Sequence, residues 1–160
     1  MPALHIDEID AKILNLLQSY GRIKRKAIAE QVGLTVPSVS ERLRKLEERG
    51  IVLGYHAFVE AKSLNYDIAA FIRVTVDTSS HYGSVIDHLC ASQEVLEVHS
   101  ITGEGSHIVK VRTRDTVALE RLLSHIQSLT GVTGTSTSIV LSTFKESQQV
   151  VAEPTSLPRR

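Results

Sequence analysis

The chain has 160 residues with 18 basic and 18 acidic side chains, so its formal net charge of zero implies no general attraction to nucleic acid. This length suits one ordinary domain or two small ones, and 42% apolar residues are enough for a packed core. The single cysteine, Cys90, excludes an intrachain disulfide and a zinc site built from cysteine pairs.

The first fifty residues carry the pattern of three helices. Apolar residues recur at helical spacing across Ile6–Leu17, which predicts the first helix. A short second helix is predicted over residues 25–31, with Gly33 as its C-terminal glycine. Thr35 is the expected N-cap of a third helix, whose amphipathic pattern continues until Gly50. Two short helices joined by a glycine turn are typical of a helix-turn-helix.

The remainder of the chain mixes strand and helix patterns. The apolar run over residues 51–59 predicts a strand or a wing hairpin, and residues 61–66 form a connector that marks the domain boundary. Beyond it the patterns predict strands 68–76, 95–102, 107–113 and 132–144 and helices 81–91 and 115–129. This βαββαβ order is that of a ferredoxin-like domain, so the fold class is α+β.

The region from Arg22 to Lys45 has the strongest local charge. It contains seven basic and two acidic residues, an excess of five positive charges in a neutral chain. In a helix-turn-helix the second helix enters the major groove by its N-terminal residues, where small hydroxyls allow close approach and basic side chains bind phosphate or guanine. We therefore predict DNA binding rather than a merely solvated charged face. The candidate DNA-binding residues are Lys24, Arg25, Lys26, Thr35, Val36, Pro37, Ser38, Ser40, Glu41, Arg42, Arg44 and Lys45.

Several segments of the chain resemble those of a known family. They include Ala29–Thr35, Val39–Leu43, Thr102–Glu104 and Gly131–Val132. With them the chain resembles the Lrp/AsnC (leucine-responsive, feast/famine) transcriptional regulators over most of its length. The resemblance implies a winged helix-turn-helix domain that binds double-stranded DNA, a hinge strand, and a βαββαβ domain that dimerises through its sheet. It also implies further assembly to tetramers or octamers and an amino acid or related metabolite bound at subunit interfaces.

These features predict three regions. Residues 1–60 would form the winged helix-turn-helix domain with the hinge strand, and residues 61–145 the domain for effector binding and oligomerisation. Residues 146–160 are polar, contain two prolines and end in Arg-Arg, so we expect a mobile tail.

The effector candidates lie on a turn and on the last strand. Glycines in the turn would allow backbone N–H groups to meet a carboxylate, although an ordinary hairpin turn also uses glycine. Threonines would offer hydroxyls, although threonine is also simply a good strand residue. The candidates are Thr102, Gly103, Glu104, Gly105, Ser106, Thr135 and Thr137. Two residues depart from the family pattern: Ser106 replaces an acidic residue that would suit an α-amino group, and Thr130 replaces a proline.

Other chemistry is expected to be absent. The seven histidines form no metal-ligand motif, no catalytic set has motif context, and we expect neither a cofactor nor an enzyme. Cys90 shares a helix face with Ile86 and is expected in the core. Siroheme decarboxylases resemble the same family, and a similar enzyme is the alternative. It would need a tetrapyrrole pocket with histidines or arginines, and His99, His107, Lys110 and Arg112 lie on the predicted middle strands. A second alternative is a nucleoid-organising protein that binds DNA with low sequence specificity.

The sequence also bears on location. No apolar run reaches the roughly 18 residues of a membrane span. Residues 1–7 lack the basic and apolar regions of a signal peptide. We therefore expect a cytoplasmic protein without a membrane partner.

Overall fold

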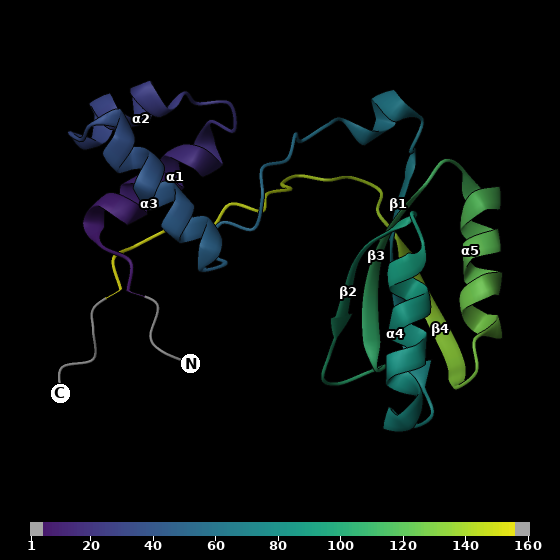
Figure 1. Cartoon of the computed structure of the whole chain (residues 1–160). Coiled ribbons are helices and arrows are strands. Elements are labelled where there is room, and N and C mark those ends of the chain that lie inside the picture. The colour runs from purple at the N-terminus through teal and green to yellow at the C-terminus, as the bar shows by residue number, and fades with distance from the viewer. Residues whose placement is uncertain (1–4, 156–160) are drawn as a thin grey trace. The chain divides into compact units, whose positions relative to one another are not determined.

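The computed structural model describes residues 5–155, which form two compact units (Figure 1). The N-terminal unit takes the described residues up to Phe58 together with those from Glu146 onward, and the C-terminal unit is Val59–Lys145. The expected boundary after residue 60 lies two residues from this division. Of the expected mobile tail, residues 146–155 are grouped with the N-terminal unit, and residues 156–160 lie outside the described residues.

The N-terminal unit contains the three predicted helices, α1 (Glu8–Ser19), α2 (Arg25–Val32) and α3 (Val36–Glu48). Each boundary has a local cause. The Asp7 carboxylate accepts a hydrogen bond from the Asp10 amide and caps α1, and Gly33 ends α2 with a φ of 70°. The helices bury one apolar cluster, which includes Ile13, Ile28, Val39, Leu43 and Leu46.

The predicted strand or wing hairpin over residues 51–59 is wrong. This segment has no strand, and it leads into a short 3-10 helix, η1 (Ala61–Leu64). Leu53 and Phe58 are 91% and 81% exposed. The apolar pattern of a strand is present, but a strand also needs a neighbour for its backbone hydrogen bonds, and none of the described strands pairs with this segment.

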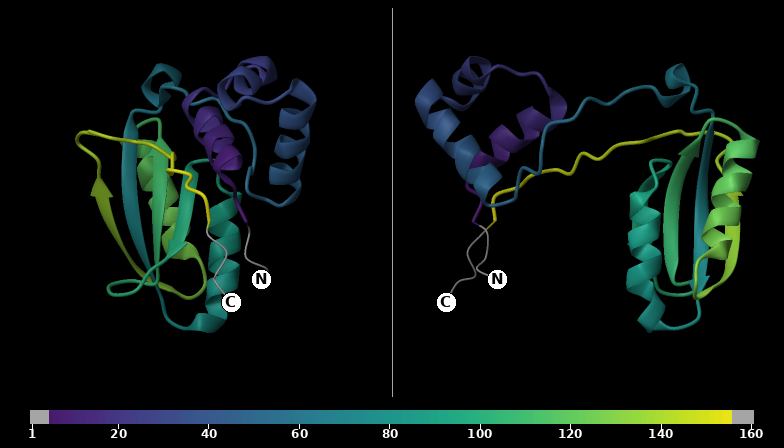
Figure 2. Two further views of the ribbon diagram at one scale, coloured as in Figure 1. Left: turned by 90° about the vertical axis from the view of Figure 1, so that its left-hand side faces the viewer. Right: turned by 45° about the vertical axis from the view of Figure 1, so that its right-hand side comes forward.

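The C-terminal unit has the predicted βαββαβ order. The elements are β1 (Ile68–Val76), α4 (Tyr82–Ala91), β2 (Val95–Ser100), β3 (His107–Thr113), α5 (Thr116–Ser128) and β4 (Val132–Ile139), with the 3-10 turn η2 (Ser79–His81) before α4. The sheet is antiparallel, with strand order β2-β3-β1-β4 (Figure 2). The last strand ends five residues before the predicted Phe144, and Leu141 and Phe144 are exposed.

One face of this sheet carries the core. Alternate residues of β1 and β3, from Ala70 to Val76 and from His107 to Thr113, are buried. They pack with Val85 and Leu89 of α4 and with apolar residues of α5. The prediction for Cys90 is wrong, because its side chain is exposed. The core-facing stripe of α4 passes through Val85 and Leu89, and Cys90 lies one residue, about 100°, beyond it.

Candidate DNA-binding and effector sites

The first turn of α3 presents small side chains to solvent. The Thr35 hydroxyl accepts a hydrogen bond from the Ser38 amide at 3.3 Å and lies 2.9 Å from the Ser38 hydroxyl. Val36, Pro37 and Ser38 are exposed, whereas Ser40 is half-buried. An exposed helix N-terminus with short side chains can approach a base edge or a phosphate closely.

The basic cluster of Lys24, Arg25 and Lys26 lies at the start of α2, and all three side chains are exposed. The Arg25 guanidinium donates to the Ser40 hydroxyl of α3 at 3.4 Å. This contact joins the basic cluster to α3. The arrangement places cations for phosphate beside a helix that can enter a groove.

Arg42, a predicted DNA contact, has acidic partners within the N-terminal unit. Its guanidinium donates to the carboxylates of Asp7 and Asp10 of the α1 region, at 2.7 Å in each case. Burial alone would raise the pKa of Asp7, but hydrogen bonds from the Asp10 amide and from Arg42 hold it below its ordinary value. Arg42 therefore braces α3 against α1, and its charge is compensated within the protein.

Arg44 and Lys45 are exposed, but both have acidic partners. Arg44 lies 2.6 Å from Glu41 and 2.5 Å from Glu48, and Lys45 lies 3.5 Å from Glu41. The hydrogen bond from Arg44 is the main reason that the pKa of Glu41 falls to about 2. Exposed pairs of this kind are weak, so either cation can exchange its carboxylate for a phosphate at little cost.

The turn between β2 and β3 has the geometry that its glycines predict. Gly103 and Gly105 have φ values of 96° and 83°. Thr102, Gly103 and Glu104 are exposed. The Ser106 amide donates to the Val74 carbonyl at 2.9 Å, which fixes the end of the turn to β1. Exposed backbone between two left-handed glycines can present N–H groups to an anion.

The Ser106 side chain has a structural task that the sequence did not reveal. Its hydroxyl is buried, accepts from the Val76 amide at 3.1 Å and donates to the Val76 carbonyl at 3.4 Å. The hydroxyl thus extends the bonding of β3 to β1 beyond their last pair. It does not offer a polar group at the surface of the turn.

Thr135 and Thr137 do not join the turn. They pair with Val74 and Ile72 on the β4 side of β1, whereas the turn is attached on the β3 side. Two strand spacings separate β3 from β4, which is about 10 Å. In addition, the Thr135 hydroxyl accepts from the Gln127 amide of α5 at 2.8 Å. The predicted effector residues therefore lie in two places.

Comparison with known proteins agrees with this two-part arrangement. Residues 6–52 match a winged helix-turn-helix DNA-binding model, and residues 69–150 match the Lrp/AsnC ligand binding domain. The chain is 37% identical over 145 residues to the HTH-type transcriptional regulator FL11 of Pyrococcus horikoshii, covering 91% of this chain and 95% of the relative. It belongs to the Lrp/AsnC family. The leucine-responsive regulatory protein of Escherichia coli K12 is 31% identical over 156 residues, covering 94% of this chain and 93% of that protein.

A solved structure extends the similarity to the whole fold. A transcriptional regulator from Neisseria meningitidis, in complex with L-methionine, matches with a TM-score of 0.85 and 30% identity, covering 90% of this chain and 95% of that chain. The predicted α+β fold and helix-turn-helix are confirmed. This Lrp/AsnC protein is a DNA-binding transcriptional regulator. Within residues 5–155, no helix is long and apolar enough to cross a membrane.

His107 was a candidate only for the alternative enzyme, and in this Lrp/AsnC chain it lies in the core. The side chain is fully buried against the Tyr82 ring, with ring centroids 4.7 Å apart. Its Nδ1 lies 3.2 Å from the Ser100 hydroxyl, Nε2 has no hydrogen-bond partner, and burial lowers its pKa. Lys110 and Arg112 alternate with the buried positions of β3 and so face the opposite side of the sheet. The four residues of the enzyme hypothesis do not line one pocket.

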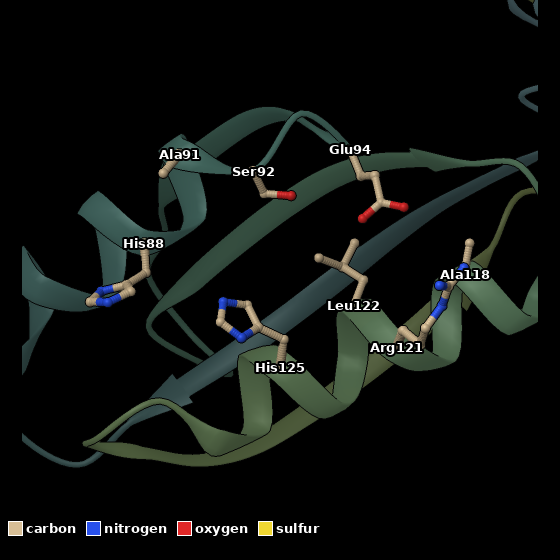
Figure 3. Close-up of a pocket in the computed structure, with 8 residues that line it drawn as sticks. All are labelled: His88, Ala91, Ser92, Glu94, Ala118, Arg121, Leu122 and His125. Atoms are coloured by element: carbon tan, nitrogen blue, oxygen red, sulfur yellow. The ribbon is translucent and has the colours of Figure 1, made fainter.

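The Lrp/AsnC domain also has a cleft of about 480 Å³ between α4 and α5 that the sequence did not predict (Figure 3). Its polar lining includes His88, His125, Glu94 and Arg121, around Leu122. Figure 3 shows the two imidazoles toward one end of the cleft. No cluster of three metal-ligating side chains occurs anywhere in the described part of the chain. The cleft therefore combines charges of both signs without the ligands of a metal centre.

Proposed function

We propose that this regulator binds double-stranded DNA as a homodimer, with the first turn of α3 in the major groove and Lys24, Arg25 and Lys26 on the phosphate backbone. The observation that carries the proposal is the contact of Arg25 with Ser40, because it places the basic cluster beside the exposed turn. A single short helix contacts few bases, and a dimer doubles the half-sites it can recognise. Arg44 and Lys45 add phosphate contacts by exchange of their carboxylate partners.

The proposed effector is an amino acid or a related small metabolite that binds at the turn of residues 102–106. The relative from Neisseria meningitidis in complex with L-methionine supports this class of ligand. In this chain Ser106 cannot bind an amine, because its buried hydroxyl is bonded to Val76. The exposed carboxylate of the turn is that of Glu104. We infer that the N–H groups near Gly103 and Gly105 bind the effector carboxylate and that Glu104 binds its amine.

The proposed dimer forms through the sheet face that α4 and α5 leave uncovered. Phe71 and Leu96 are 40% and 51% exposed in the isolated chain. Exposed apolar side chains on an open sheet face favour association. We propose that dimers assemble further to tetramers or octamers in the cytoplasm, that the effector shifts this assembly, and that the protein catalyses no reaction.

The test is binding of the full chain to DNA from its own upstream region over a range of salt concentrations. The triple variant Lys24→Gln, Arg25→Gln, Lys26→Gln should bind more weakly, and its salt slope should fall by about 0.9 for each lost phosphate contact. The charge-matched control is Lys62→Gln, Arg121→Gln, Lys145→Gln in the C-terminal unit. Equal losses in both triple variants would contradict the proposed interface, and equal binding to any DNA would indicate a nucleoid-organising role.

A further inference from the structure

The outer face of α1 holds the segment that returns from the C-terminal unit. The Asn15 amide group donates to the Ala152 carbonyl at 2.9 Å and accepts from the Ala152 amide at 2.9 Å. Gln18 does the same with Val150, at 2.8 and 2.9 Å. Asn15 and Gln18 are three residues apart and share one helix face. Their spacing matches alternate residues of an extended chain.

These bonds recognise the backbone of the segment rather than its side chains. Val150 and Val151 are 74% and 83% exposed, so their side chains contribute little burial. Only Ala152 packs against the apolar core of the N-terminal unit. The side-chain amides of α1 thus act as a neighbouring strand would, and they satisfy both backbone groups at every second residue.

The same segment also contacts the start of α1. The Ile6 amide donates to the Thr155 hydroxyl at 2.8 Å, and the Thr155 amide donates to the Ile6 carbonyl at 3.0 Å. The next residue, Asp7, caps α1 and binds Arg42 of α3. A continuous chain of contacts therefore leads from the C-terminal segment through α1 to the helix proposed to enter the groove.

We propose that the Asn15–Gln18 face of α1 is a docking surface for this chain's own residues 149–155, and that their docking is a releasable clasp on the DNA-binding unit. When residues 149–155 are docked, the N-terminal unit is connected to the C-terminal unit twice, through residues 53–60 and through residues 140–148. Ordering an extended segment costs about as much free energy as a few exposed hydrogen bonds return, so both states are accessible. The docked clasp restrains the N-terminal units of a dimer and favours binding to paired half-sites, a consequence that rests on the proposed function.

Amide hydrogen exchange of the full chain tests the docking. The Val150 and Ala152 amides should exchange at least about tenfold more slowly than the intervening Val151 and Glu153 amides, because only the first pair is bonded to α1. The double variant Asn15→Leu, Gln18→Met keeps the side-chain size and should abolish this alternation. Lys12→Met, another exposed position of α1, should leave it unchanged. Equal exchange at all four amides of the wild-type chain would overturn the proposal.

The coupling is tested with the same proteins and two duplexes, one with a single half-site and one with a pair. The Asn15→Leu, Gln18→Met variant should bind the single half-site like wild type and the paired site at least about fivefold more weakly. The reason is that a less restrained second N-terminal unit has a lower effective concentration at the second half-site. Unchanged paired-site binding would overturn the clasp's influence on DNA. If the wild-type chain binds neither duplex, the proposed function fails, whereas the exchange pattern still decides the docking.

Discussion

Replacement of Arg42 by methionine tests the brace between α3 and α1. Methionine keeps an unbranched apolar stem but leaves the Asp7 and Asp10 carboxylates without their cation. The Arg42 and Asp10 side chains are 30% and 13% exposed, and Asp7 is 39% exposed, so its share of the loss is screened by solvent. Breaking a fully buried pair costs about 3–5 kcal/mol and an exposed pair less than about 1 kcal/mol. We expect Arg42→Met to lower the free energy of unfolding by about 2–3 kcal/mol.

Urea unfolding followed by helical circular dichroism measures this loss, with Arg44→Met as the matched control. Arg44 has as many acidic partners, but all of them are exposed, so its replacement should destabilise the fold much less than that of Arg42. Arg44→Met should instead weaken DNA binding. If Arg42→Met proves no more destabilising than Arg44→Met, the brace contributes nothing and Arg42 returns as a candidate for direct DNA contact.

The pH dependence of the same loss follows from the lowered pKa of Asp7. A carboxyl group whose pKa is lower in the folded state than its ordinary 3.8 stabilises the fold fully above that pH. This stabilisation disappears as the pH falls below 3.8 and through the folded pKa. The difference between wild type and Arg42→Met should therefore shrink in acid.

Three further substitutions have defined outcomes. Thr35→Ala removes the N-cap of α3 and should cost about 1 kcal/mol in urea unfolding, with weaker DNA binding. Ser106→Ala leaves the buried Val76 amide without its partner and should cost about 1–3 kcal/mol in urea unfolding. Burial lowers the pKa of His107 in the folded state from 6.5, so the stability of the wild-type protein falls as the pH drops below 6.5. His107→Phe removes this group, and its Tm should therefore fall less than that of wild type over the same acid range. An equal fall of Tm in the two proteins would contradict this assignment.

The sequence predicted elements whose signals are local. The apolar spacing of α1, the Thr35 cap and the alternation in β1 and β3 are all properties of a few consecutive residues. Strand β3 was predicted with the bounds that it has, His107–Thr113. These signals were sufficient for the βαββαβ order and for the helix-turn-helix.

The sequence did not reveal partners that lie far away along the chain. Arg42 has the pattern of an exposed cation on α3, and the carboxylates that it binds are 32 and 35 residues away. The polar composition near Ala152 gives no sign of the bonds to α1, which span 137 residues. Residues 51–59 have a strand pattern without a strand to pair with. Periodicity describes which face a residue can present, and only the fold determines what that face meets.

The most direct test of the account is the equilibrium affinity of the full chain for its own upstream DNA and for a scrambled duplex, with and without each amino acid at fixed salt. We expect the upstream DNA to be bound at least about a thousandfold more tightly than the scrambled duplex. One amino acid should change the upstream affinity by about 5-fold to 150-fold, as a coupled effector does. Equal affinity for the two duplexes, or no response to any amino acid, would contradict a ligand-responsive, sequence-specific regulator.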